Sequence, residues 1–252
     1  YRFLGPDVIC KKALSPAQFK VFPTRTIYTY EDERVTLTLT FTTPMLPYDF
    51  KYLSAPITFV DLQVSSKDNK EHNVELYFDV GIEWCVDTNN QKVSWEKLDS
   101  DGGLVLLKAV SVEQPILEKS GDNRRIDWGY LYLAVPNLRD YTTKIDKREV
   151  NLKQFAENGR LSADSGISAP IAPEETQVAL SCTVSMKVNA NSSASGCVVI
   201  GYDDVYSIEF FGEKLKPWYY KEYSENFSNL VDKLYREHSE IIEKCKAWDE
   251  EV

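Results

Sequence analysis

The sequence contains only two histidines in 252 residues, and it lacks the short motifs that would assign a reaction. It has no GxSxG, no HExxH, no glycine-rich phosphate loop and no EF-hand pattern. His72 falls in a predicted turn and His238 on the apolar stripe of a predicted helix, with no nucleophile or metal-ligand spacing near either. We therefore predict no catalytic residue, no metal site and no cofactor in this chain.

Basic residues are also in short supply. Lys and Arg number 29 against 39 Asp and Glu, which gives a formal net charge of −10. Nucleic acids and anionic membrane surfaces both need a basic partner surface, so we predict neither as a partner. No apolar run approaches the roughly 20 residues of a spanning helix, so we predict no transmembrane segment. The chain shows no signal peptide, and removal of an upstream one would leave the same start at Tyr1.

The five cysteines are odd in number and include no CxxC pair, which argues against a zinc site of the usual spacing. Cys85, Cys182 and Cys197 fall within predicted strands, where free thiols pack as small apolar residues. One disulfide remains compatible with this set, so the cysteines leave the redox compartment undecided.

The strongest positive signal is a strict alternation over residues 73–86. Apolar side chains occupy every second position, namely Val74, Leu76, Phe78, Val80, Ile82, Trp84 and Val86. Successive side chains of a strand point to opposite faces, so this pattern places all seven on one face. We predict one long strand over 73–86, with this face in the core.

The same alternation recurs along most of the chain. Further strands are predicted at 26–30, 35–42, 57–64, 92–97, 104–112, 127–135, 178–188, 197–201 and 205–211. Residues 65–70 read as a turn that makes strand 57–64 the antiparallel neighbour of strand 73–86. The fold class predicted is mainly β, a large two-sheet antiparallel β-sandwich (super-sandwich) of roughly ten strands or more.

Two segments break the strand pattern. Residues 136–176 are polar and proline-containing, with a short helix predicted at 150–158; we interpret them as a crossover between sheets, with a domain boundary as the alternative. From 224 to 250, apolar residues recur every three or four positions, which predicts a connector helix about 39 Å long. We therefore predict a β-sandwich domain over 1–223 and a linker helix over 224–252 that leads to a missing helical domain.

Carboxylates beside aromatic residues are the candidate site. Asp127 precedes Trp128, and the pair Asp203-Asp204 precedes Tyr206. Burial in such surroundings can raise a carboxyl pKa for acid–base chemistry, although strand-end aspartates also commonly accept backbone N–H groups. The candidates for binding or for a domain junction are Asp127, Trp128, Tyr130, Asp203, Asp204 and Tyr206.

Six stretches together, residues 23–31, 39–44, 74–80, 119–122, 126–132 and 202–212, resemble the N-terminal region of the glutaminase A family. The order is the same along nearly the whole chain. The resemblance implies a secreted, periplasmic or cell-surface protein in which this β domain precedes a helical toroid. It also implies that the full protein hydrolyses L-glutamine to L-glutamate and ammonia, with the helical toroid as catalytic partner; no catalytic residue of the family is carried over to these positions.

A second interpretation stays open, because the chain holds 15 tyrosines and five tryptophans. A carbohydrate- or glycan-binding module of a glycoside-hydrolase-like protein also uses exposed aromatic side chains. Coplanar exposed rings around a groove would favour sugar binding, whereas one continuous apolar patch would favour packing against another domain.

Overall fold

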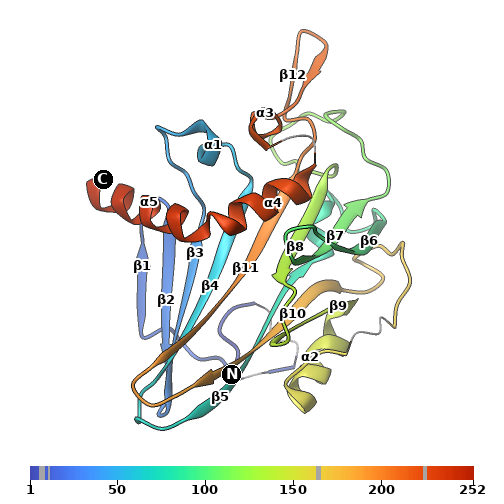
Figure 1. The fold of residues 1–252 in the computed structure, drawn as a ribbon. Coiled ribbons are helices and arrows are strands. Elements are labelled where there is room, and N and C mark those ends of the chain that lie inside the picture. Colours follow the sequence, from blue (N-terminus) through green and yellow to red (C-terminus); the bar gives the residue numbers. More distant parts are fainter. Residues whose placement is uncertain (6–8, 11, 163–165, 224–225) are drawn as a thin grey trace.

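The computed structural model describes residues 1–5, 9–10, 12–162, 166–223 and 226–252. Two antiparallel sheets face each other, and helices cover their outer faces (Figure 1). The large sheet has eight strands in the order β1-β2-β3-β4-β11-β8-β7-β6, and the small sheet has three in the order β5-β10-β9. The prediction of a mainly β, antiparallel sandwich is confirmed.

The large sheet is built from short antiparallel connections. Its strands are β1 (Gln18–Val21), β2 (Arg25–Glu31), β3 (Val35–Thr42), β4 (Ile57–Ser66), β11 (Ser193–Asp203), β8 (Tyr130–Pro136), β7 (Leu104–Ser111) and β6 (Val93–Asp99). The hairpin predicted between the first two strand patterns is present as β2–β3. The Asp32 side chain closes its turn by accepting from the backbone N–H groups of Arg34 (2.7 Å) and Val35 (2.8 Å).

The small sheet consists of β5 (His72–Gly81), β10 (Val178–Val188) and β9 (Tyr141–Lys147). The predicted pairing of β4 with β5 is wrong, because β4 pairs with β3 and β11 while β5 pairs with β10. The turn after β4 therefore carries the chain from one sheet to the other. The side chains on the two faces of each strand explain why the strands lie in different sheets. β4 carries apolar side chains on both faces, whereas the outer face of β5 carries Tyr77 and Asp79.

The strand predicted over 73–86 ends at Gly81, and the 3-10 helix η1 (Ile82–Cys85) follows it. The predicted register is confirmed within β5, since Leu76 and Val80 are buried and Phe78 packs against the core. Trp84 is a correction, because its side chain is 53 % exposed. The turn of η1 breaks the period of two, so the chain reaches the core again through Ile82 and Cys85 instead.

The segment 136–176 is confirmed as a crossover between sheets, since it runs from β8 of the large sheet to β10 of the small sheet and contains β9. The sequence did not predict β9. The predicted helix is present as α2 (Arg148–Asn158), and it ends at Gly159 with a left-handed φ of 70°. That conformation suits a helix C-terminus because glycine has no side chain to strain it.

The single C-terminal helix predicted over 224–250 is two helices, α4 (Phe227–Arg236) and α5 (His238–Glu251), with a break at Glu237. The predicted start at Ser224 lies outside the described residues. Both helices cross the outer face of the large sheet (Figure 1). Leu230, Leu234 and Ile241 are buried there in a second core, which lies opposite the core between the sheets.

The last predicted strand, 205–211, is a small hairpin that stands away from both sheets (Figure 1). It consists of β12 (Ile208–Phe210) and β13 (Glu213–Leu215). Two short helices lie near it, α1 (Phe50–Leu53) in the β3–β4 loop and α3 (Tyr219–Tyr223) directly before α4. These three pieces form the end of the molecule at which β11 terminates.

Candidate functional site

The two acid-and-aromatic stretches that the sequence singled out meet in the structure. Strands β8 and β11 are antiparallel neighbours, with Tyr130 opposite Asp203. The Trp128 indole Nε1 donates to the backbone oxygens of Asp204 (2.9 Å) and Tyr206 (3.3 Å). Five of the six predicted residues therefore lie together at one end of the large sheet.

The sixth candidate, Asp127, belongs to a separate ion pair. Its side chain is 1 % exposed and accepts from Gln91 Nε2 at 2.9 Å and from Lys119 Nζ at 2.5 Å. The hydrogen bond to Asp127 raises the pKa of Lys119, which keeps this lysine charged. Its carboxylate is thus occupied by two side-chain donors, and neither is the backbone N–H group that the sequence analysis named as the structural alternative.

Asp203 is the last residue of β11, and tyrosines surround its carboxylate. It is 4 % exposed and accepts from the hydroxyls of Tyr219 (2.8 Å) and Tyr220 (3.0 Å), and from the backbone N–H of Val205 (3.0 Å). Burial, and after it the charge of Asp203, raises the pKa of Tyr219 far above its ordinary value. Both phenols therefore stay protonated and donate, and Asp203 serves as a fixed acceptor.

The two tyrosines of this cluster were missed by the sequence analysis. They lie in α3, and the run Trp218-Tyr219-Tyr220 was the available signal. Tyr219 also contacts the neighbouring carboxylate, with its hydroxyl 2.9 Å from Asp204 Oδ1. Asp204 Oδ2 accepts from Ser207 Oγ at 2.5 Å. Asp204 is half-buried, so of the two aspartates it is the one that a bound molecule can reach.

A groove of about 600 Å³ opens beside this cluster. It lies between the α1–β4 connection, the β12–β13 hairpin and α3, and its walls include Ser54, Pro56, Asp204, Ser207 and Trp218. Apolar and aromatic walls with few polar groups are typical of ligand and partner sites.

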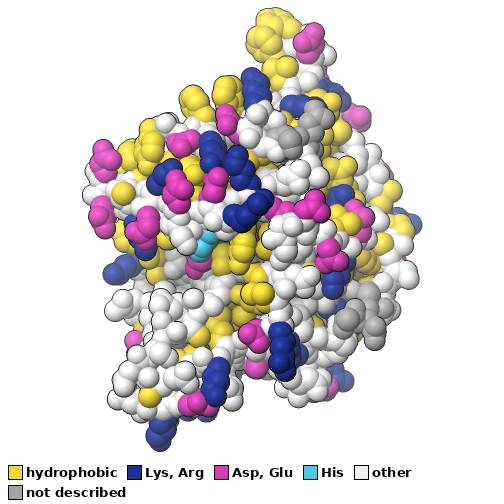
Figure 2. Space-filling model, viewed as in Figure 1, with side chains coloured by type: hydrophobic (Ala, Val, Ile, Leu, Met, Phe, Trp, Pro, Cys, Tyr) yellow, Lys and Arg dark blue, Asp and Glu magenta, His cyan; other side chains and the backbone are white. Residues whose placement is uncertain are grey.

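An exposed apolar surface surrounds the groove. We call it the apolar end surface, and it consists of Tyr48, Phe50, Leu53, Ile208, Phe210, Phe211, Leu215 and Trp218, of which Phe211 is 92 % exposed. Figure 2 shows hydrophobic side chains gathered at this end, over the hairpin and the α1 loop. The rings of Phe50 and Trp218 lie 5.7 Å apart at 57°, and those of Phe210 and Phe211 lie 4.5 Å apart at 75°. Neither pair forms the coplanar platform that sugar stacking requires.

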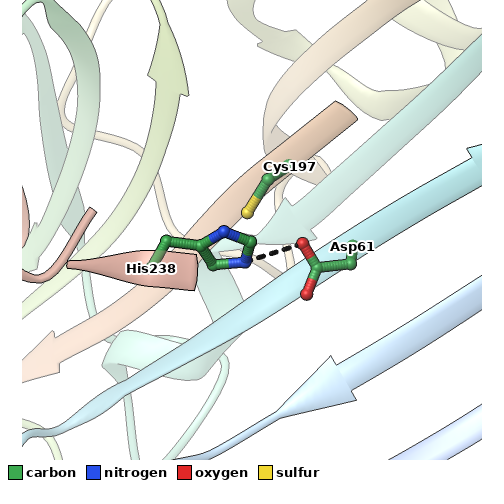
Figure 3. A group of neighbouring side chains, drawn as sticks. All are labelled: Asp61, Cys197 and His238. Atoms are coloured by element: carbon green, nitrogen blue, oxygen red, sulfur yellow. Dashed lines mark ion pairs between the residues drawn. The ribbon is translucent and has the colours of Figure 1, made fainter. Parts of the chain in front are cut away.

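A second group of side chains was not predicted at all. Asp61, Cys197 and His238 meet between the large sheet and α5, with one ligand atom of each within 4.8 Å of the others (Figure 3). The other histidine, His72, forms an ion pair with Asp68 at 2.7 Å. All five cysteines are free, and four of them, Cys85, Cys182, Cys197 and Cys245, are buried.

A family model described as "Domain of unknown function (DUF5127)" matches residues 24–252. Glutaminase A of Aspergillus oryzae is 24 % identical over 151 residues, which is 59 % of this chain and 21 % of that protein. The chain therefore spans about a fifth of the length of this curated relative. In the described part of the chain, no helix combines the length and apolarity that a membrane span requires.

Two solved structures show weaker likeness. A protein assigned as a kojibiose phosphorylase from the human microbiome has a TM-score of 0.45 and 9 % identity, over 90 % of this chain and 23 % of its own. Heparan sulfate lyase HepC from Pedobacter heparinus has a TM-score of 0.35 and 6 % identity, over 75 % of this chain and 22 % of its own. At these values neither structure carries a functional argument.

Proposed function

This chain belongs to the DUF5127 family, and we propose that it is the non-catalytic β domain of a glutaminase-like hydrolase. The reaction proposed for the whole protein is the hydrolysis of L-glutamine to L-glutamate and ammonia. The similarity to glutaminase A supports this proposal, and most of that relative's length has no counterpart in this chain. The partner we propose is a helical domain of the same polypeptide, reached through α4 and α5. A location outside the cytoplasm stays a prediction from the family resemblance.

The observation that carries the proposal is the apolar end surface. Monomeric proteins seldom expose many large apolar side chains at one end of the molecule unless that end binds something. Burial of one Leu or Phe side chain is worth about 1.5–3 kcal/mol, so eight large side chains offer ample free energy for domain docking. The hairpin that presents four of the eight residues is tied to the body, because Lys214 Nζ donates to the backbone oxygen of Ile116 at 2.7 Å.

The groove gives this docking surface a possible chemical role. A helical domain seated on the surface would close the groove and bring Asp204 to the edge of the joint site. A carboxylate at that edge attracts the α-ammonium group of glutamine, and lower exposure to water would strengthen the attraction. Asp203, already satisfied by tyrosine hydroxyls, would hold the loop that presents Asp204. We propose Asp204 as a binding residue and not as a catalytic one.

Docking is tested by mixing this chain with a separately purified helical domain and measuring their affinity by calorimetry. Phe50→Ala and Trp218→Ala should each weaken binding by roughly tenfold or more, since central aromatic residues dominate interface energetics. Leu138→Ala is the matched control, because Leu138 is 63 % exposed and lies outside the apolar end surface. Equal affinity for all three variants would remove this surface from the proposal.

The role of Asp204 is tested by ammonia release from glutamine. The 252-residue chain alone should release none, whereas the longer protein should be active. In the longer protein, Asp204→Ala should leave the unfolding temperature close to that of the parent and lower turnover, while the exposed control Asp101→Ala should change neither. Ammonia release that scales with the isolated chain and disappears on Asp203→Asn would place catalysis in this domain and contradict the proposal.

The glycan-binding alternative has one observation in its favour, namely that Trp218 is 45 % exposed in the groove wall. A sugar stacked on this indole would change the tryptophan fluorescence of the isolated chain. The tilt of Phe50 against Trp218 works against such stacking. Saturable binding of a glycan, lost in Trp218→Ala, would favour the alternative over domain docking.

A further inference from the structure

Three potential metal ligands converge from three different elements. Asp61 in β4 and Cys197 in β11 are direct cross-strand partners, so their side chains leave the sheet on the same face. His238 is the first residue of α5, and its ring points to the same place from the helix layer (Figure 3). The break between α4 and α5 at Glu237 is what brings this ring down onto the two strands.

The histidine nitrogen that faces the group has no hydrogen-bond partner. His238 Nε2 is 2.9 Å from Asp61 Oδ1, yet it is buried and makes no hydrogen bond within the described residues. The two atoms are close, but the angle between them does not suit a hydrogen bond. Buried polar atoms are nearly always paired, so a nitrogen in this state points to a missing partner.

The ring itself is held in place by aromatic neighbours. Phe59, which is fully buried, lies edge-on with its centroid 4.8 Å from that of His238, and Tyr235 stacks at 6.5 Å. On the other side of the group, the Tyr141 hydroxyl accepts from the backbone N–H of Cys197 at 3.2 Å. Neighbours of this kind orient the first ligands of a metal site and limit the access of water.

We propose that Asp61, Cys197 and His238 form a binding site for a divalent transition metal, with zinc as the preferred ion. Zinc accepts sulfur, nitrogen and oxygen ligands at about 2.0–2.3 Å, so its tetrahedral ligands lie roughly 3–4 Å apart. The observed separations need only small side-chain movements to meet this geometry. A thiolate and a carboxylate together neutralise Zn²⁺, which suits a half-buried position.

A cysteine nucleophile is the competing use of the same three residues. Cys197 is only 7 % exposed, lies in the helix–sheet interface and does not belong to the walls of the groove beside Asp204. Burial also raises the pKa of this thiol well above its ordinary value. An inaccessible thiol that stays protonated is a poor nucleophile, whereas a metal ion displaces its proton directly.

The role that follows for the metal ion is to link the large sheet to the C-terminal helices. The ion would join β4 and β11 to the start of α5, at the point where the helix ladder is interrupted. The proposed metal site is separate from the groove, so the ion would affect the position of α5 and not the chemistry of a bound substrate.

The test uses the purified 252-residue chain, stripped with a chelator and titrated with zinc or cobalt. We expect one zinc per chain by mass spectrometry of the metal content, and a thiolate-to-cobalt charge-transfer band with Co²⁺. Cys197→Ser, His238→Gln and Asp61→Asn should each lower zinc affinity by at least about 10–100-fold. The controls His72→Gln and Cys245→Ser, which change the other histidine and another buried cysteine, should retain the metal.

Folded wild-type chain that binds no zinc, or zinc binding that all three ligand variants retain, would overturn the proposal. If Cys197→Ser fails to fold, the cobalt spectrum of the wild type decides, because the absence of a thiolate charge-transfer band excludes Cys197 as a ligand. Zinc should also raise the unfolding temperature of the wild type and leave that of His238→Gln unchanged.

Discussion

Asp249 ties the end of α5 to the start of β2 in the large sheet. Asp249, which is 7 % exposed, accepts from the backbone N–H of Thr24 (2.9 Å), from Thr24 Oγ1 (2.8 Å) and from Arg25 Nε (2.7 Å). The side chains of the ion pair are 12 % exposed for Arg25 and fully buried for Asp249. Asp249→Ala removes the acceptor of all three bonds and leaves the guanidinium of Arg25 with an empty space before it.

The expected loss follows from this geometry. Removal of one partner from a buried ion pair costs about 3–5 kcal/mol, because the remaining charge is uncompensated. We expect the lower half of this range, since Arg25 can reach water if the last turn of α5 unwinds. A loss of about 3–4 kcal/mol lowers the unfolding temperature by roughly 6–16 °C for a domain of 150–250 residues.

The assay is urea unfolding followed by tryptophan fluorescence, with Glu250→Ala as control because Glu250 is exposed and adjacent. The double variant Arg25→Met/Asp249→Ala should recover part of the loss, since it removes the stranded charge. A free energy of unfolding for Asp249→Ala within about 0.5 kcal/mol of the wild type would refute the reasoning, because surface substitutions have effects of that size. It would mean that the end of α5 is not bound to β2.

Two further substitutions test the fold around the site. Leu234→Asp, at a fully buried position of α4, should impair folding because it buries an unpaired charge, whereas Ser239→Asp on the exposed side of α5 should not. Equal thermal stability of Leu234→Asp and wild type would show that the helices are a free tail. Gly129→Ala should lower the free energy of unfolding by about 1–3 kcal/mol because the backbone there has a φ of 83°. The loss should be larger still because the new Cβ would lie 2.2 Å from the backbone oxygen of Asp203, and denaturant unfolding would measure it. Gly103→Ala is its matched control, because Gly103 has a φ of 85° and open space, so similar losses at both glycines would exclude the clash.

The strands were predictable because alternation depends only on neighbours in the sequence. Residues 178–188 alternate strictly, and β10 has the same bounds. Pairing was less predictable, since it depends on which faces other elements cover. The turn after β4 has the composition of a hairpin, yet β4 pairs with β3 and β11 while β5 pairs with β10, so the two strands lie in different sheets.

Two errors have the same physical origin. The apolar residues of 73–86 and of 224–250 keep their period across a break in the backbone, at Gly81 and at Glu237. The period of the apolar residues indicates which side chains are buried, but it does not indicate whether the backbone is straight between them. After Gly81 the burial shifts from Trp84 to Cys85, and the sequence offers no signal for that shift.

The functional residues were also predictable only in part. Trp128, Asp203 and Asp204 were found because acids beside aromatic residues are visible locally, and the pairing of β8 with β11 brought them together. The group of Asp61, Cys197 and His238 has no such local signal, because its members come from three distant segments and have no ligand spacing. A cross-strand pair and a helix break had to be known before those residues could be placed side by side.

The groove and the proposed metal site are separable, although they share β11. Cys197 and Asp203 differ by an even number of positions, so both face the helix layer, and the rise of a strand puts them about 20 Å apart. Val199 and Gly201 lie between them on that face, the second in contact with Phe227 of α4. Loss of zinc would therefore act on Asp204 only by moving α4 along β11. If the ligand variants lose zinc but retain the affinity of the chain for its helical domain, α4 stays fixed by its own apolar contacts. If zinc binding and this affinity are lost together, the ion sets the position of the helix on which the docking surface depends.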